Sequence, residues 1–286
     1  MVKKFIFRVF CGFFLGLSVF APGFSGSVIA IIMGVYHDLL RIISNPFKQF
    51  KQNFIYCLPL AIGGFLSAVF FVISFRFLFE TYERATYILF VGLIAGNMPI
   101  ILAEVKKYNI QRNHLVGGIL AFMFAFAVCV LGGGIGGASG DNAVGLTIFA
   151  ISGFIGGAVL LVPGMSISTI LIIMGVYGPL IIAAESLVRM NFEYFTPIGI
   201  FAAFALIGLV SASRGIKFVF EKLPDFANTA VFGFMGGSLF GIFAQSLQIE
   251  DPHFNWIYGG VMFAIGLLAS LLFVSMGKAM NEEKAK

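Results

Sequence analysis

The chain has 286 residues, of which 59% are hydrophobic and 11% are charged. A soluble domain carries about 25% charged residues, so this composition excludes the ordinary soluble classes of protein. Apolar runs of about 20 residues recur, and each is long enough to cross a bilayer core of roughly 30 Å. The sequence therefore predicts an all-α polytopic membrane protein, because a helix satisfies its own backbone hydrogen bonds in lipid.

The first predicted element, over 5–43, is an apolar segment with a break in it. It contains the stretch APGFSGSVIAIIMGVY, in which a Pro-Gly pair and a second glycine interrupt the helix. Three uninterrupted apolar runs follow this element. They are predicted to form helices over 54–75, 85–103 and 114–131.

The second half of the chain repeats this order. A second broken element is predicted over 143–184, and helices are predicted over 195–213, 228–247 and 256–276. Residues 163–181 match residues 22–40 at 12 of 19 positions, where chance would give roughly two. The chain therefore divides into repeat one, 1–140, and repeat two, 141–286.

Glycines spaced four residues apart also recur at the offset of 141. The pairs Gly12/Gly16 and Gly92/Gly96 match the pairs Gly153/Gly157 and Gly233/Gly237. This spacing lets two helices approach closely, so we interpret these glycines as packing positions.

The distribution of positive charge favours a particular membrane topology, because Lys and Arg cluster on the cytoplasmic side. If each broken element enters the membrane and returns, 15 of the 18 Lys and Arg residues lie inside and Arg76, Arg84 and Arg189 lie outside. If each element crosses once, 11 lie inside and 7 outside. The path in which each element enters and returns places more Lys and Arg residues inside, so it is favoured. It also places both termini inside.

This path inserts the second half upside down. The predicted fold is two inverted-topology repeats, each a re-entrant (broken) helical hairpin plus three transmembrane helices, an arrangement typical of secondary transporters. The charge count does not distinguish a re-entrant hairpin from two full crossings. The short arms on either side of the first break favour the re-entrant hairpin.

The breaks have the residues of an anion site. A half-helix that begins after a Pro-Gly pair directs unpaired N–H groups and a positive dipole end toward the break, and serine hydroxyls add donors. The candidate phosphate-binding residues are Pro22, Gly23, Ser25, Gly26 and Ser27 in the first copy, and Pro163, Gly164, Ser166 and Ser168 in the second. The alternative is that these residues only kink and cap two helices, and the duplication disfavours it.

Four charged residues are further candidates. Arg76 and Arg214 end corresponding helices, and arginine binds phosphate through two hydrogen bonds. The alternative is that they are interface anchors whose side chains reach the water. Glu80 and Glu221 match at the offset of 141 and could couple protons to transport, although pairing with nearby Lys or Arg is favoured.

Neither a metal site nor a cofactor site is predicted. The three cysteines and three histidines are scattered along the chain, without the spacing of a zinc site, and no catalytic triad or nucleotide-binding motif is present.

The stretches APGFSGSVIAIIMGVYHDLL and VPGMSISTILIIMGVYGPLI resemble the paired PGxSG and GxY signatures of the PopT-type polyprenyl-phosphate translocase family, bacterial membrane proteins once known only as a domain of unknown function. The resemblance covers essentially the whole chain. It implies a multi-pass protein of the bacterial plasma membrane that flips undecaprenyl phosphate from the outer to the inner leaflet, recycling the carrier for peptidoglycan and other envelope polymers. It also implies that the motif residues of both copies bind the phosphate. Ile167 stands where the family has glycine after Ser166, which leaves equal phosphate contact by both hairpins open.

Two other functions are weighed against this one. A secondary transporter of a small anion or another solute would share the inverted repeats and the anion site. An intramembrane lipid phosphatase would need a nucleophile or a metal cluster, which the sequence lacks. We therefore expect a lipid transporter and not an enzyme, with a polyprenyl-phosphate lipid and the membrane as partners and no nucleic acid. A homo-oligomer is left open.

Overall fold

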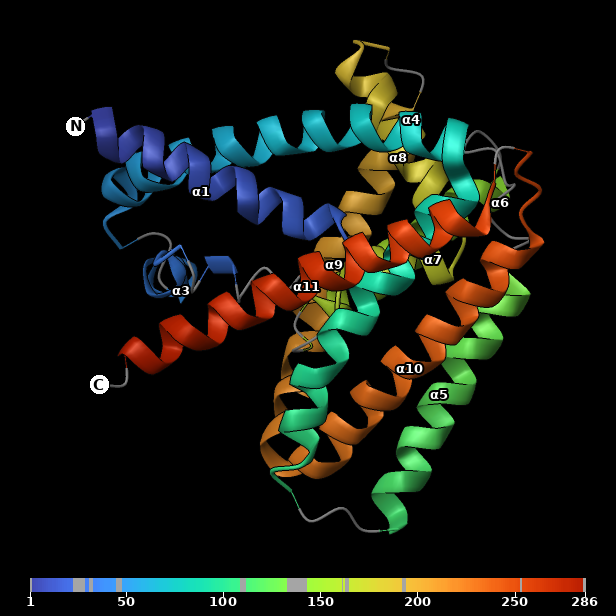
Figure 1. The fold of residues 1–286 in the computed structure, drawn as a ribbon. Helices are drawn as coiled ribbons and strands as arrows, with labels where there is room; N and C mark the ends of the chain where they lie inside the picture. The colour runs from blue at the N-terminus through green and yellow to red at the C-terminus, as the bar shows by residue number, and fades with distance from the viewer. Residues whose placement is uncertain are drawn as a thin grey trace.

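The computed structural model describes residues 2–22, 29–30, 33–44, 48–108, 112–132, 143–160, 162, 165–191, 194–252 and 254–284. Every regular element in these ranges is a helix (Figure 1). The helices are α1 (Val2–Phe20), α3 (Tyr36–Ser44), α4 (Phe50–Val105), α5 (Arg112–Gly132), α6 (Ala143–Val159), α7 (Ile167–Ile173), α8 (Tyr177–Val188), α9 (Phe195–Lys222), α10 (Pro224–Gln248) and α11 (Trp256–Lys284).

Six helical segments in the described residues are long and apolar enough to cross a membrane. Two of them, Phe50–Ser74 and Phe77–Val105, belong to α4, and the others lie in α5, α9, α10 and α11. Large apolar side chains on these helices point outward, as expected where lipid is the solvent: Phe65 is 67% exposed and Leu131 is 78% exposed. The prediction of an all-helical polytopic membrane protein is confirmed.

Helix α4 contains two consecutive spans. The sequence predicts separate helices over 54–75 and 85–103, and the structure has the spans Phe50–Ser74 and Phe77–Val105, with a kink of non-helical backbone at Tyr82 (φ −138°, ψ 49°). The residues that link the two predicted helices contain neither glycine nor proline. Thr86 stabilises the kink, because its hydroxyl donates to the carbonyl oxygens of Tyr82 (2.9 Å) and Leu78 (3.2 Å).

Glycine packing joins the first helix of each broken element to the long helix that follows it. On α1, Gly12 and Gly16 lie against the backbones of Leu60 and Gly64 of α4, so closely that a β-carbon would collide. Contacts that advance in the same direction on both helices mean that α1 and α4 run parallel (Figure 1). The glycines therefore act as packing positions, as predicted.

The second half repeats this contact. On α6, Gly153 lies against Phe201 and Gly157 against Ala205, both of α9. Each contact pair is displaced from its counterpart in the first half by 141 residues on both helices. The same residue spacing thus gives the same parallel helix pair twice.

Two further parallel pairs join one half of the chain to the other. On α10, Gly233 and Gly237 lie against the backbones of Gly118 and Phe122 of α5. In the reciprocal pair, Gly92 of α4 lies against the backbone of Phe263 of α11. The last helix of each half therefore packs on the other half, as the orange and green helices of Figure 1 show for α10 and α5.

The repeated sequence MGVY forms the same turn in both copies. Gly34 and Gly175 adopt left-handed φ values of 71° and 69°, which glycine tolerates without steric cost. The N–H after each glycine bonds the carbonyl five residues back, Val35 to Ala30 and Val176 to Leu171, both at 2.9 Å. These are the hydrogen bonds of a Schellman helix end. In the second copy the turn sets α7 and α8 at 116° to each other.

Candidate functional site

The structure describes part of the predicted phosphate site. Pro22, Ser166 and Ser168 are described, and all three are buried. The remaining motif residues, Gly23, Ser25, Gly26, Ser27, Pro163 and Gly164, lie outside the described residues. Arg76 belongs to α4, but its side chain is not among those described.

Ser166 and Ser168 form a buried hydroxyl pair at the start of α7. Their Oγ atoms lie 2.7 Å apart, and the two residues are 8% and 1% exposed. Ser166 has the extended backbone of a helix N-cap (φ −117°, ψ 139°), yet its side chain makes no capping hydrogen bond to α7. The bond between the two hydroxyls uses one hydroxyl hydrogen, so the pair has a second one to donate to an anion.

The carbonyl end of α1 meets the start of α8 in the centre of the molecule. The hydroxyl of Tyr177, the last residue of the second MGVY sequence, donates to the carbonyl oxygen of Phe20 at 2.8 Å. Ala21 directly follows Phe20 and shares one buried cluster with Tyr177 and with Ile167, which lies between the two serines. The structure thus brings the start of the first break together with the second broken element.

Aromatic side chains surround this junction. The ring of Tyr177, which is 3% exposed, packs against Phe79 and Phe90 of α4 with ring centroids 5.8 and 5.7 Å apart. Sequence reasoning placed Tyr177 only within a family signature. Its role as a link between the halves depends on a contact between residues 157 positions apart, which no local pattern reveals.

Two of the other charged candidates, Arg214 and Glu221, lie on the exposed surface of α9. Arg214 is on the exposed side of α9, and no hydrogen bond joins it to the serine pair in the described part of the chain. Glu221 lies 3.7 Å from Lys217, and both side chains are mostly exposed, so this ion pair contributes little to stability. The preferred interpretation of Glu221 as an ion-pair partner agrees with this contact.

Glu80 has different surroundings from its sequence counterpart. It lines a cavity of about 330 Å³ between α4 and α8, next to the kink of α4, together with Glu83, Phe79 and Pro179. Phe79 also packs on Tyr177, so this cavity borders the central junction. The two glutamates that match in the repeat therefore do not share one environment.

Sequence reasoning missed a buried ion pair on α8. Glu185 is 1% exposed, and its Oε1 accepts a hydrogen bond from Nε of Arg189 at 2.6 Å. Arg189 itself is mostly exposed, so it reaches from the surface to a carboxylate that would otherwise be costly to bury. The sequence feature that could have indicated this ion pair is the single glutamate in the otherwise apolar stretch LIIAAESLV.

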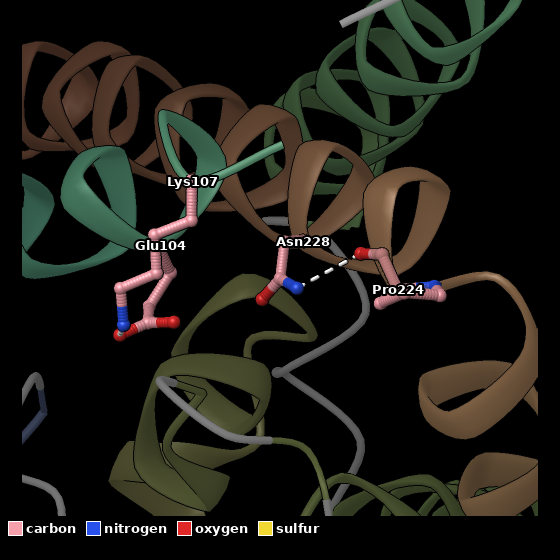
Figure 2. Close-up of polar contacts among 4 residues, drawn as sticks. All are labelled: Glu104, Lys107, Pro224 and Asn228. Carbon is pink, nitrogen blue, oxygen red and sulfur yellow. Dashed lines mark hydrogen bonds and ion pairs between the residues drawn. The ribbon is translucent and has the colours of Figure 1, made fainter. Parts of the chain in front are cut away.

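Polar residues also gather where α4 ends and α10 begins (Figure 2). Lys107 pairs with Glu104 at 2.6 Å, and the Asn228 amide donates to the carbonyl oxygen of Pro224 at 2.8 Å. Glu104 is 21 residues from Glu83, or about 30 Å along α4, which is the thickness of a bilayer core. The acidic cavity and this polar cluster thus lie near opposite ends of one span.

No group of three or more His, Cys, Asp or Glu side chains with the arrangement of a metal site occurs among the described residues. The chemistry that the described site offers is hydrogen-bond donation by buried hydroxyls, in a surrounding that is otherwise apolar.

Comparison with known proteins identifies the family. Residues 15–253 match the family described as VCA0040-like, undecaprenyl phosphate translocase-like. A Staphylococcus aureus protein named polyprenyl-phosphate transporter is 28% identical over 275 residues, covering 91% of this chain and 93% of the relative. A Vibrio cholerae protein of the same name is 27% identical over 246 residues, covering 80% of this chain and 74% of the relative.

No solved structure matches the chain. The match to the family covers most of the sequence, and the six apolar spans agree with it. The predicted resemblance and the predicted location are confirmed: this is a multi-pass protein of the bacterial cell membrane, and it belongs to the undecaprenyl phosphate translocase-like family.

Proposed function

We propose that this protein flips undecaprenyl phosphate from the outer to the inner leaflet of the cell membrane. The carrier would thereby return to the face where peptidoglycan and other envelope polymers are begun. The observation that carries the proposal is the buried Ser166–Ser168 pair at the junction of the two halves, in a chain whose relatives are named polyprenyl-phosphate transporters. A phosphate that leaves water needs such donors, because an unpaired charge in the membrane is costly.

The proposed topology is two inverted repeats with both termini inside. Helix α1 packs parallel to the first span of α4, which supports the path in which the first broken element enters the membrane and returns. If that element crossed the membrane once, α4 would start from the opposite side and the two helices would run antiparallel. Parallel packing of α10 with α5 supports the inversion. Successive spans alternate in direction, so α10 runs opposite to the second span of α4, its counterpart in the repeat (Figure 1).

In the proposed mechanism the phosphate passes the junction of the two broken elements while the tail stays in lipid. Pro22, Gly23, Ser25, Gly26 and Ser27 would face it from the first element, and Pro163, Gly164, Ser166 and Ser168 from the second. Arg76 would receive the phosphate at the outer face and Arg214 would release it inside. The site would be open to the two leaflets in turn, as in other transporters with inverted repeats.

Glu80 is the better of the two proposed coupling residues. It lines the cavity beside the central junction, whereas Glu221 pairs with an exposed lysine. A carboxylate at this position could take up a proton from the outer face during each transport cycle.

Reconstitution distinguishes this function from the alternatives. The purified full chain is placed in vesicles with polyprenyl phosphate in one leaflet, and three quantities are followed: lipid in the other leaflet, uptake of labelled inorganic phosphate, and phosphate released from the lipid. Lipid movement alone supports the proposal. Uptake of the soluble anion without lipid movement would favour a solute transporter, and released phosphate would favour a phosphatase.

A further inference from the structure

The side chain of Arg84 on α4 lies against two aromatic rings at the start of α11. Its guanidinium carbon is 4.3 Å from the ring centroid of Phe254 and 5.2 Å from a ring centroid of Trp256. The two rings meet at 82° with centroids 5.2 Å apart, so they form a corner next to the guanidinium. A cation–π contact orients the guanidinium through its charge and does not require its N–H donors, which stay available for a ligand.

No acidic side chain pairs with Arg84 in the part of the chain that the structure describes. None of the ion pairs there includes it, although Glu83 is its neighbour in sequence. Its Nε atom is buried, and no described group accepts a hydrogen bond from it. The carboxylates of Glu80 and Glu83 belong to the cavity on the α8 side of α4, whereas Arg84 contacts α11. Arg84 therefore offers a charge and hydrogen-bond donors that the described protein groups do not use.

The repeat shows that the fold itself does not require a positive charge at this position. At the offset of 141, the counterpart of Arg84 is Asp225. The backbones correspond, because two residues earlier Tyr82 (φ −138°, ψ 49°) and Leu223 (φ −133°, ψ 51°) make the same break. An aspartate in the first turn of α10 is stabilised by the helix dipole, and an arginine in the corresponding place lacks this stabilisation. A functional role explains why the first half has the arginine.

The residues beside Arg84 indicate the depth of this site in the membrane. Trp256, Ile257 and Tyr258 at the start of α11 are 60%, 72% and 60% exposed. Exposed Trp and Tyr rings gather at the level of the lipid headgroups. Under the proposed topology this end of α11 lies at the outer face. An anion bound to Arg84 would therefore lie among the headgroups of the outer leaflet, and an attached apolar chain would lie in the adjacent lipid.

We propose that Arg84, oriented by Phe254 and Trp256, binds the phosphate of the transported lipid at the outer face. This proposal rests on the proposed function and adds a residue that binds the substrate there. A phosphate monoester carries close to two negative charges and more free oxygens than the phosphodiester of a bulk phospholipid, so a guanidinium binds it more strongly. The inner counterpart, Asp225, would repel the same group, so the two faces of the protein differ in their affinity for it.

The fluorescence of Trp256 tests the site directly, because the chain has no other tryptophan. The full chain in phosphatidylcholine nanodiscs is titrated with polyprenyl phosphate and, separately, with phosphatidylglycerol. We expect a saturable change of emission at a mole fraction of polyprenyl phosphate about tenfold lower than that of phosphatidylglycerol. Arg84→Gln should weaken the affinity for polyprenyl phosphate by about tenfold to a hundredfold. Arg112→Gln, at an exposed arginine of α5, is the control and should leave the affinity unchanged.

A purely structural role of Arg84 predicts a different result. Arg84→Gln would then lower the thermal midpoint and leave the affinity for polyprenyl phosphate unchanged, which would overturn the proposal. An equal response to phosphatidylglycerol would also overturn it.

Arg84→Lys provides a second variant if Arg84→Gln does not fold. It keeps the charge but loses the planar fork of donors, so we expect its affinity to fall about threefold to tenfold. Wild-type affinity in this variant would contradict the proposal. Lipid movement by the wild type without a response of Trp256 would contradict the Arg84 site alone, whereas absence of lipid movement by the wild type would contradict the proposed function.

Discussion

The hydroxyl of Tyr177 donates a hydrogen bond to the carbonyl oxygen of Phe20 at 2.8 Å, and this bond joins the two broken elements of the chain. Phe20 is the last residue of α1, so its carbonyl has no partner within the helix. Tyr177 begins α8. One side chain therefore satisfies the end of one element and fixes the position of the next.

Removal of this hydroxyl should loosen the junction. Tyr177→Phe keeps the ring packing but removes the hydrogen bond to the Phe20 carbonyl oxygen, so we expect a loss of about 1 kcal/mol in stability. Thermal unfolding of the protein in detergent measures this as a lower midpoint. Tyr258→Phe, at an exposed ring on α11, is the control and should unfold like the wild type. An unchanged midpoint for Tyr177→Phe would show that the bond does not hold the two elements together.

The glycine contacts predict which helices tolerate a methyl group. Gly157→Ala forces α6 away from the backbone of Ala205 and should cost about 1–3 kcal/mol, the usual penalty of overpacking. A methyl group on Gly260 of α11 meets no atom within 4 Å, so Gly260→Ala should be neutral or slightly stabilising. Equal thermal midpoints for the two variants would contradict the packing of α6 on α9.

The Glu185–Arg189 pair predicts an asymmetry between two conservative variants. Arg189→Gln leaves the buried carboxylate of Glu185 without its guanidinium partner and should cost about 1–3 kcal/mol, the usual penalty for removing one partner of a buried hydrogen bond. Glu185→Gln removes the buried charge and leaves an arginine that water already solvates, so its cost should be smaller. Denaturation of both variants in the same detergent gives the comparison. A larger loss of stability for Glu185→Gln than for Arg189→Gln would contradict the interpretation that a surface arginine compensates a buried carboxylate.

The inverted topology predicts the faces reached by a membrane-impermeant thiol reagent. In a variant without the native cysteines, Phe50→Cys should react only from inside and Met190→Cys only from outside. Both positions are exposed in the structure, at 62% and 77%, so lack of reaction reports the membrane side. Labelling of both from the same face would rule out inverted repeats.

Much of the fold could be predicted from hydropathy and repetition, because apolar length determines which segments can span the membrane. The boundary between the predicted helices 54–75 and 85–103 contains the kink of α4, but the exact position of the kink at Tyr82 could not be predicted, since no glycine or proline marks it and it depends on packing and on the hydroxyl of Thr86. Sequence reasoning also centred the break on the Pro-Gly pairs. The described part of the structure adds a second turn at Gly34 and Gly175, where positive φ explains the glycine of each MGVY sequence.

Only part of the candidate site could be predicted from the sequence. The duplicated serines were found by repetition, and the structure shows Ser166 and Ser168 bonded to each other and buried. Tyr177 and Glu185 were not found, because their partners or their burial depend on the tertiary fold.

The most direct test of the central claim is the rate at which the reconstituted chain moves polyprenyl phosphate between leaflets, compared with the double variant Ser166→Ala/Ser168→Ala. Loss of the one hydrogen bond that the serine pair can donate to a charged phosphate, at about 1.5–3 kcal/mol, should slow movement by about tenfold to a hundredfold or more. Ser275→Ala, at an exposed serine of α11 whose hydroxyl donates to the Leu272 carbonyl oxygen of the same helix, controls for loss of a hydroxyl. The account predicts rapid movement by the wild type and the control and slow movement by the double variant. Equal rates for all three proteins would contradict it.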